Sequence, residues 1–225
     1  MKVISVKKFL VILGSARDST PPRPARLGLR VARQCRNHLE SLGHGAELID
    51  SLSIELPGVF KPHFAYARGA APQALEALAD KIEAADGYVM VSPEYNHSMS
   101  PALAHLLNHF GSSLFSYKPS AIVTYSAGQW GGARAAVSMR TFLSELGCLP
   151  VSAMIHIPKA QEILSEAGDF SSDAEAEAWQ GYFDRTLAQL EWWAAAALAH
   201  RKAQGIPDAA PSFSRDPSQR NAPGG

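Results

Sequence analysis

The sequence of 225 residues has few of the features that mark disulfide-rich, nucleic-acid-binding or membrane-spanning proteins. Its two cysteines, Cys35 and Cys148, are too few for a disulfide framework and lack the spacing of metal ligands, which favours a reducing compartment. Lysine plus arginine equals aspartate plus glutamate at 21 each, so no overall charge attracts nucleic acid or a membrane surface. No apolar run has the length of a membrane span or of the core of a secretory signal. We therefore expect a cytoplasmic protein with neither nucleic-acid nor membrane partners.

Short apolar runs alternate with helical patterns along most of the chain, which predicts an α/β fold. Runs rich in β-branched residues predict five strands, at residues 9–13, 46–50, 87–91, 119–125 and 148–157. Apolar residues that recur every three or four positions predict helices between them, at about 24–42, 72–85, 102–110 and 133–146. Right-handed crossovers would wind this order into a doubly wound, five-stranded parallel sheet with helices on both faces.

The C-terminal part of the chain departs from this alternation. We expect a domain over residues 1–160, a helical extension over 161–204 and a disordered, proline-containing tail over 205–225. The extension has an alanine-rich helical pattern from about residue 172, with Asp173 as a candidate cap. Its apolar stripe consists of Trp179, Phe183, Leu187, Leu190, Trp193 and Leu198. The pattern leaves open whether this stripe packs on the domain or on a second subunit.

The turn after the first predicted strand has the composition of an anion-binding loop. Residues 14–23 are rich in hydroxyls and arginine and lead into a helix, whose free N–H groups and dipole favour an anion. Arg17 can form a bidentate pair with a phosphate, and hydroxyl hydrogen bonds can come from Ser15, Ser19 and Thr20. The alternative is a plain helix cap with solvated arginines.

Two further turns follow predicted strands and so belong to the same carboxyl edge of the sheet. The stretch 92–101 offers a rigid ring, a carboxylate, a flat ring, an amide and an imidazole in Pro93, Glu94, Tyr95, Asn96 and His97. Its alternative interpretation is a surface turn held by side-chain hydrogen bonds. The stretch 126–132 includes Ser126, Gly128, Gln129, Gly131 and Gly132, and its glycines would let the backbone approach a flat ligand closely.

These three turns together resemble the NADPH-dependent FMN reductase family, which has a flavodoxin-like fold. The matching segments are residues 14–17, 93–98 and 126–134, within roughly residues 8–157. The resemblance implies that the FMN phosphate is gripped by Ser15, Arg17 and either Ser19 or Thr20. It implies that the flavin ring lies against backbone groups of Pro93, Glu94, Tyr95 and Asn96, with His97 near the ring edge or merely solvated. Its other flank would meet Ser126, Gly128, Gly131 and Gly132.

The resemblance also implies an activity and an assembly. Members of the family transfer hydride from NADPH or NADH to bound FMN and on to a flavin, a quinone or a similar small-molecule acceptor, usually as homodimers or homotetramers. Because the cofactor carries this chemistry, we expect no catalytic side chain and no metal. Backbone N–H groups near Gly131 and Gly132 are candidates for stabilising charge on the reduced ring. The alternatives are a flavodoxin-like electron carrier and a non-catalytic flavin- or partner-binding module, because a fold does not by itself establish a function.

Two stretches depart from the family pattern. Prolines at Pro21, Pro22 and Pro24 follow the hydroxyls of the first turn, where the family often has an asparagine. Ala104 and His105 replace a lysine–asparagine pair that usually follows the second turn. These differences bear on the grip on the phosphate and on the choice of substrate.

Overall fold

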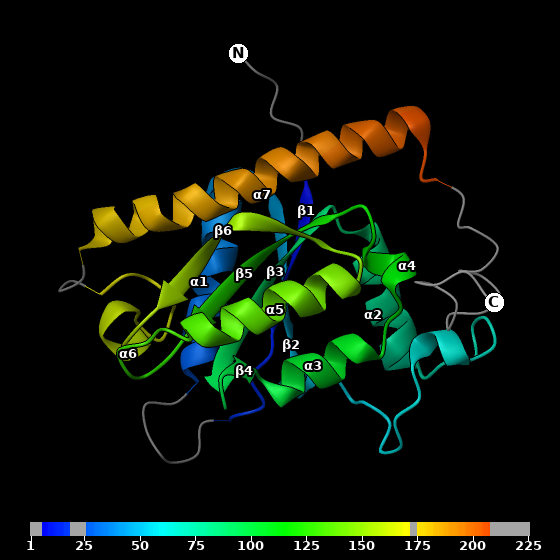
Figure 1. Cartoon of the computed structure of the whole chain (residues 1–225), viewed down its shortest axis with the longest axis horizontal. Helices are drawn as coiled ribbons and strands as arrows, with labels where there is room; N and C mark the ends of the chain where they lie inside the picture. Colours follow the sequence, from blue (N-terminus) through cyan, green and yellow to red (C-terminus); the bar gives the residue numbers. More distant parts are fainter. Residues whose placement is uncertain (1–5, 19–25, 172–174, 208–225) are drawn as a thin grey trace, which may run out of the picture.

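A parallel β-sheet covered by helices on both faces forms the centre of the molecule (Figure 1). The structure is a computed structural model that describes residues 6–18, 26–171 and 175–207. Within these residues the sheet has the strand order β2-β1-β3-β5-β6. The strands are β1 (Lys8–Leu13), β2 (Gly45–Asp50), β3 (Gly87–Tyr95), β5 (Pro119–Tyr125) and β6 (Leu149–Ile157), and each adjacent pair is parallel. The predicted flavodoxin-like, doubly wound parallel sheet is confirmed.

Helices on both faces explain why the central strands are continuous apolar runs rather than alternating ones. In β1, Phe9, Val11 and Leu13 belong to the core under α1 (Leu27–Ser41) and α7 (Ala176–Gln204). Leu10 and Ile12 of the same strand belong to the core on the opposite face. The helices of that face are α2 (Gln73–Ala84), α3 (Pro101–Asn108), α4 (Ser112–Phe115) and α5 (Ala133–Glu145).

The C-terminal helix α7 packs on the sheet of its own chain, against β5 and β6. Its buried apolar side chains are Phe183, Leu187, Leu190 and Ala194, which recur every three or four positions. The predicted place of Trp193 on this stripe is wrong, because Trp193 is 42% exposed and Ala194 takes the buried position. Trp193 precedes Ala194 by one position and therefore points about 100° away from it around the helix. The hydrophobicity of the tryptophan alone did not show which of the two faces the sheet. Asp173 and residues 208–225 lie outside the described residues.

The second turn is more regular than its composition predicted. β3 continues to Tyr95 and pairs through a hairpin with the antiparallel strand β4 (Ser98–Met99). Asn96 and His97 form the two-residue turn between them and have positive φ angles of 48° and 61°. Such angles at both central residues match a type I′ turn, which asparagine enters more readily than most residues.

Three short helical turns complete the described chain. They are the 3₁₀ turns η1 (Ser51–Ser53) and η2 (His63–Ala65), which lie in the long connection from β2 to α2, and α6 (Ala160–Ile163) after β6. Among the helices of the described ranges, none combines the length and the hydropathy that a bilayer crossing needs.

Candidate functional site

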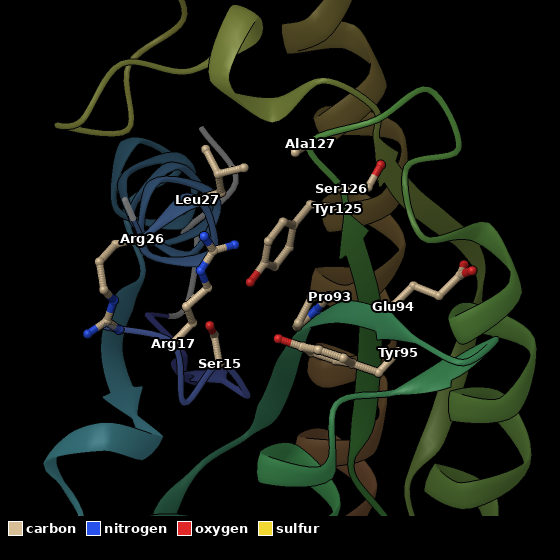
Figure 2. A pocket seen from close by; sticks show the side chains of 10 residues that line it. All are labelled: Ser15, Arg17, Arg26, Leu27, Pro93, Glu94, Tyr95, Tyr125, Ser126 and Ala127. Carbon is tan, nitrogen blue, oxygen red and sulfur yellow. The ribbon is translucent and has the colours of Figure 1, made fainter. Parts of the chain in front are cut away.

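A cleft opens at the edge of the sheet where β1, β3 and β5 end (Figure 2). Its volume is about 240 Å³, and it is lined by Ser15, Arg17, Arg26, Leu27, Pro93, Glu94, Tyr95, Tyr125, Ser126 and Ala127. Residues from all three predicted turns therefore meet in one place. The predicted residues that line the cleft are Ser15, Arg17, Pro93, Glu94, Tyr95 and Ser126.

Gly14 turns the chain from β1 into the cleft. Its N–H donates to the carbonyl oxygen of Val91 at 2.9 Å, which keeps the turn attached to β3. A Cβ atom at this position would lie 2.2 Å from Cβ of Leu103 in α3, so only glycine lets α3 pack here. The next residue, Ser15, is thereby held at the base of the cleft with only 6% of its surface exposed.

One end of the cleft is cationic. Arg17 and Arg26 both line it, and α1 begins beside them at Leu27, so the dipole of this helix adds to the positive potential. The Arg26 guanidinium donates to Oδ2 of Asp50, at the end of β2, over 2.6 Å. Its Nε is buried and has no hydrogen-bond partner among the residues that the structure describes. Ser19 and Thr20 lie outside the described residues, so their part in an anion site stays a prediction.

Sequence reasoning missed Arg26, although it flanks the same loop as Arg17. The residue precedes α1 with a φ of 49°, a left-handed conformation that arginine seldom adopts and that its residue type did not signal. The ion pair with Asp50 joins residues 24 positions apart, so only the pairing of β2 beside β1 reveals it. The available signal was the repeated arginine around the loop, at Arg17, Arg23 and Arg26.

Tyr125, also missed, forms a wall of the cleft at the end of β5. Its hydroxyl reaches the first turn of α1, where a Cβ atom at Gly28 would lie 2.2 Å from it. Burial raises the pKa of Tyr125 well above its ordinary value, although a hydrogen bond with Ser15 acts the other way. The hydroxyl therefore stays protonated and can donate a hydrogen bond into the cleft.

Aromatic surface faces the cleft from two strands. Figure 2 shows the rings of Tyr125, from β5, and Tyr95, from β3, projecting into the same space beside Pro93. Tyr95 keeps 47% of its surface exposed, so much of its ring is open to a ligand. Flat apolar walls next to a cationic end suit a planar molecule that carries an anionic tail.

Glu94 lines the cleft, but its carboxylate points away from it toward α5 (Figure 2). There Oε1 pairs with Nη2 of Arg134 at 2.5 Å. Partial burial acts to raise the pKa of Glu94, but the hydrogen bond and charge of Arg134 outweigh it and hold the pKa below its usual range. The carboxylate thus anchors the β3–β4 hairpin to α5 and leaves the cleft to backbone groups of the turn.

Asn96 and His97 do not line the cleft. Both are exposed at the tip of the hairpin, one step beyond Tyr95. Their predicted contact with a flavin ring stays a prediction.

The glycine-rich loop 126–132 directly follows Tyr125, the last residue of β5. The hydroxyl of Ser126 donates to the carbonyl oxygen of Gly128 at 2.7 Å and accepts the N–H of Gly131 at 2.9 Å. Since that N–H is engaged, it is not a free donor for a reduced ring in this structure. Gly128 and Gln129 are exposed, and neither they nor Gly131 and Gly132 line the cleft.

Gly131 and Gly132 are needed for the packing of the loop, and their predicted close approach to a ligand stays a prediction. Both have positive φ angles, of 59° and 74°. Added Cβ atoms would lie 3.0 Å from the backbone nitrogen of Pro158 and 2.9 Å from Cβ of Thr124, respectively. These glycines therefore let the loop pack on β5 and on the chain after β6.

Comparison with known proteins points to one family. The family model described as NADPH-dependent FMN reductase matches residues 7–162. An NAD(P)H-dependent FMN reductase of Pseudomonas aeruginosa is 33% identical over 126 residues, which cover 54% of this chain and 66% of that protein. A quinone reductase of Escherichia coli K12 is 40% identical over 75 residues, 32% of this chain and 40% of that protein. The chain thus matches less than two thirds of the length of either relative.

A solved structure supports the fold. The flavoenzyme FerB, an NAD(P)H:(acceptor) oxidoreductase from Paracoccus denitrificans, superposes with a TM-score of 0.66 and 22% identity. The superposition covers 83% of this chain and 98% of that one.

Proposed function

Since the chain belongs to the NADPH-dependent FMN reductase family, we propose that it is an NAD(P)H-dependent FMN oxidoreductase. Its second substrate would be a flavin, a quinone or a similar small-molecule electron acceptor. The observation that carries the proposal is the cleft, in which a cationic end, Arg17 and Arg26, adjoins aromatic walls, Tyr95 and Tyr125.

The residues of the cleft fit FMN. A phosphate dianion needs cations and N–H donors, and the buried Nε of Arg26 is one donor that lacks a partner among the described residues. The flavin ring needs flat apolar contact, which Pro93, Tyr95 and Tyr125 offer. We propose that Ser15, Arg17 and Arg26 hold the phosphate, with Ser19 and Thr20 as further candidates.

Bound FMN would supply the redox chemistry, accepting a hydride from the nicotinamide and giving electrons to the acceptor. The protein's own part is to bind and orient. Arg17, Arg26 and the first turn of α1 would fix the anionic tail, and the Tyr125 hydroxyl would donate beside them. The Glu94–Arg134 pair holds the β3–β4 hairpin at a constant position beside the loop 126–132. We propose that backbone groups of Pro93 to Asn96 and of loop 126–132 face the ring.

We propose further that the protein works in the cytoplasm as a homodimer or homotetramer. Both cysteines are buried free thiols, as is usual in a reducing compartment. Two large apolar side chains exposed in the β2–α2 connection, Phe60 and Phe64, are candidates for subunit contacts. Residues 161–204 would then be an extension that packs on the domain of residues 1–160, since α7 contacts β5 and β6.

A spectroscopic experiment tests the proposal. The purified full-length chain, incubated with FMN and freed of excess, should retain the flavin absorbance band, and anaerobic NADPH or NADH should bleach it. A quinone added next should restore the band. Flavin that neither nicotinamide reduces would indicate an electron carrier or a binding module, and protein that retains no flavin would contradict the proposed cofactor.

A further inference from the structure

An exposed tryptophan lies in the loop that follows the cleft residues of β5. Trp130 is 65% exposed, and it lies in the loop whose first residues, Ser126 and Ala127, line the cleft. Its ring centroid is 5.7 Å from the Arg134 guanidinium carbon, within the usual range of a cation–π contact. The indole is thus held from one side while most of its surface faces solvent.

Arg134 connects this indole to the β3–β4 hairpin. The same guanidinium pairs with the Glu94 carboxylate, whose side chain is only 10% exposed. Because Glu94 is on the β3–β4 hairpin and Trp130 is in loop 126–132, Arg134 joins the two turns that flank the cleft. Arg134 itself is half exposed, so its position is not dictated by core packing.

The backbone under Trp130 is constrained as well. The Ser126 hydroxyl bridges Gly128 and Gly131 on either side of Trp130. The positive φ angles and close backbone contacts of Gly131 and Gly132 fix the end of the loop. An exposed side chain on such a loop loses little conformational freedom when a ligand stacks on it, which favours its use in binding.

We propose that Trp130, positioned by Arg134, is the surface on which a planar aromatic electron acceptor stacks beside the cleft. The inference rests on the proposed function and adds that the protein prefers planar aromatic acceptors. A quinone or another flat aromatic molecule gains stacking area on the indole, whereas a small inorganic oxidant does not.

Binding of a naphthoquinone to the FMN-loaded full-length protein, measured by calorimetry without nicotinamide, tests this directly. Trp130→Ala should weaken binding roughly three- to tenfold, the range expected for loss of one aromatic contact. Trp130→Phe, which keeps a ring, should recover most of the affinity. Trp192→Ala is the matched control, because Trp192 is similarly exposed at 62% but lies on α7. It should bind the naphthoquinone like the unaltered protein.

Kinetics give a second readout. In Trp130→Ala, KM for the naphthoquinone should rise while KM for ferricyanide, a non-planar inorganic acceptor, stays constant. The Kd for FMN and the rate of flavin bleaching by NADPH should not change. Unchanged naphthoquinone affinity in Trp130→Ala, an equal loss in Trp192→Ala, or a loss of FMN itself would overturn the inference.

The two proposals fail separately. If neither nicotinamide bleaches the flavin of the unaltered protein, the proposed function is wrong. The calorimetric titration uses no nicotinamide, so it still decides whether Trp130 binds a planar acceptor.

Discussion

Replacing Arg26 by alanine tests where the cleft holds a phosphate. The change removes the side chain of a residue that lines the cleft, and with it a buried Nε that has no partner among the described residues. If that group contacts the phosphate, Arg26→Ala should weaken FMN binding and leave riboflavin, which lacks the phosphate, almost unaffected. The selectivity between the two flavins is therefore the quantity of interest.

The size of the effect follows from the contacts of Arg26. Losing a hydrogen bond between charged partners costs about 1.5–3 kcal/mol, which corresponds to a roughly ten- to more than hundredfold rise in Kd. The protein itself should lose a similar amount of unfolding free energy, about 1.5–3 kcal/mol, because the Arg26–Asp50 contact also joins charged partners. Asp50 loses its 2.6 Å contact with Arg26, but it keeps the N–H of Leu52 at 3.1 Å.

The assay is a fluorescence titration of the apoprotein with FMN and, separately, with riboflavin. Arg36→Ala is the control, since Arg36 is on the same helix, where it contacts Glu40 rather than the cleft. Arg17→Ala should behave like Arg26→Ala. Equal losses for FMN and riboflavin, or an unchanged Kd for FMN, would remove Arg26 from the phosphate site.

Three further predictions concern stability. Gly14→Ala should lower the free energy of unfolding by about 2 kcal/mol or more, because its Cβ would collide with that of Leu103 at 2.2 Å. An unchanged midpoint in a urea titration would show that α3 can move away from the new Cβ at no cost in stability. Leu187→Ala should cost about 2–5 kcal/mol in the same urea titration, because this fully buried residue anchors α7 to the sheet, and a loss below 1 kcal/mol would mean that α7 is not part of the cooperative core. Burial holds the pKa values of His38 and His109 below the usual histidine value, with Asp184 opposing this for His38 and the Lys61 carbonyl for His109. As pH falls, the unfolded chain therefore binds protons before the folded protein does, so the melting temperature should fall below about pH 6.5. His109→Leu should make this dependence on pH less steep, and an unchanged slope would show that His109 does not contribute.

Local pattern was enough to predict the framework of the fold. The run Phe9–Leu13 is apolar at every position because helices cover both faces of β1, and that property is visible in five adjacent residues. Each of the three turns follows the end of such a strand and precedes a helix. Because the strands are parallel, their ends place all three turns on one edge of the sheet. For this reason the sequence alone predicted that Ser15, Pro93 and Ser126, residues far apart in the chain, would lie near one another.

The identity of the remaining cleft residues depended on contacts between distant segments. In the sequence, Tyr125 is only the last residue of a predicted buried strand. Its hydroxyl becomes part of the cleft because β5 pairs with β3 and because α1 lies close to it. The carboxylate of Glu94 could have pointed into the cleft or out of it, and the position of Arg134 on α5 decides that it points out.

Helix α7 shows the same division between pattern and packing. Its sequence determines that a helix forms and carries an apolar side. Whether a small Ala194 or a large Trp193 meets the sheet depends on the angle at which the helix lies on β5 and β6, and no local property of the chain encodes that angle. The sequence by itself thus determined the elements and their order, whereas the tertiary structure decided which side chains face the cleft, because those directions arise from packing between segments far apart in the chain.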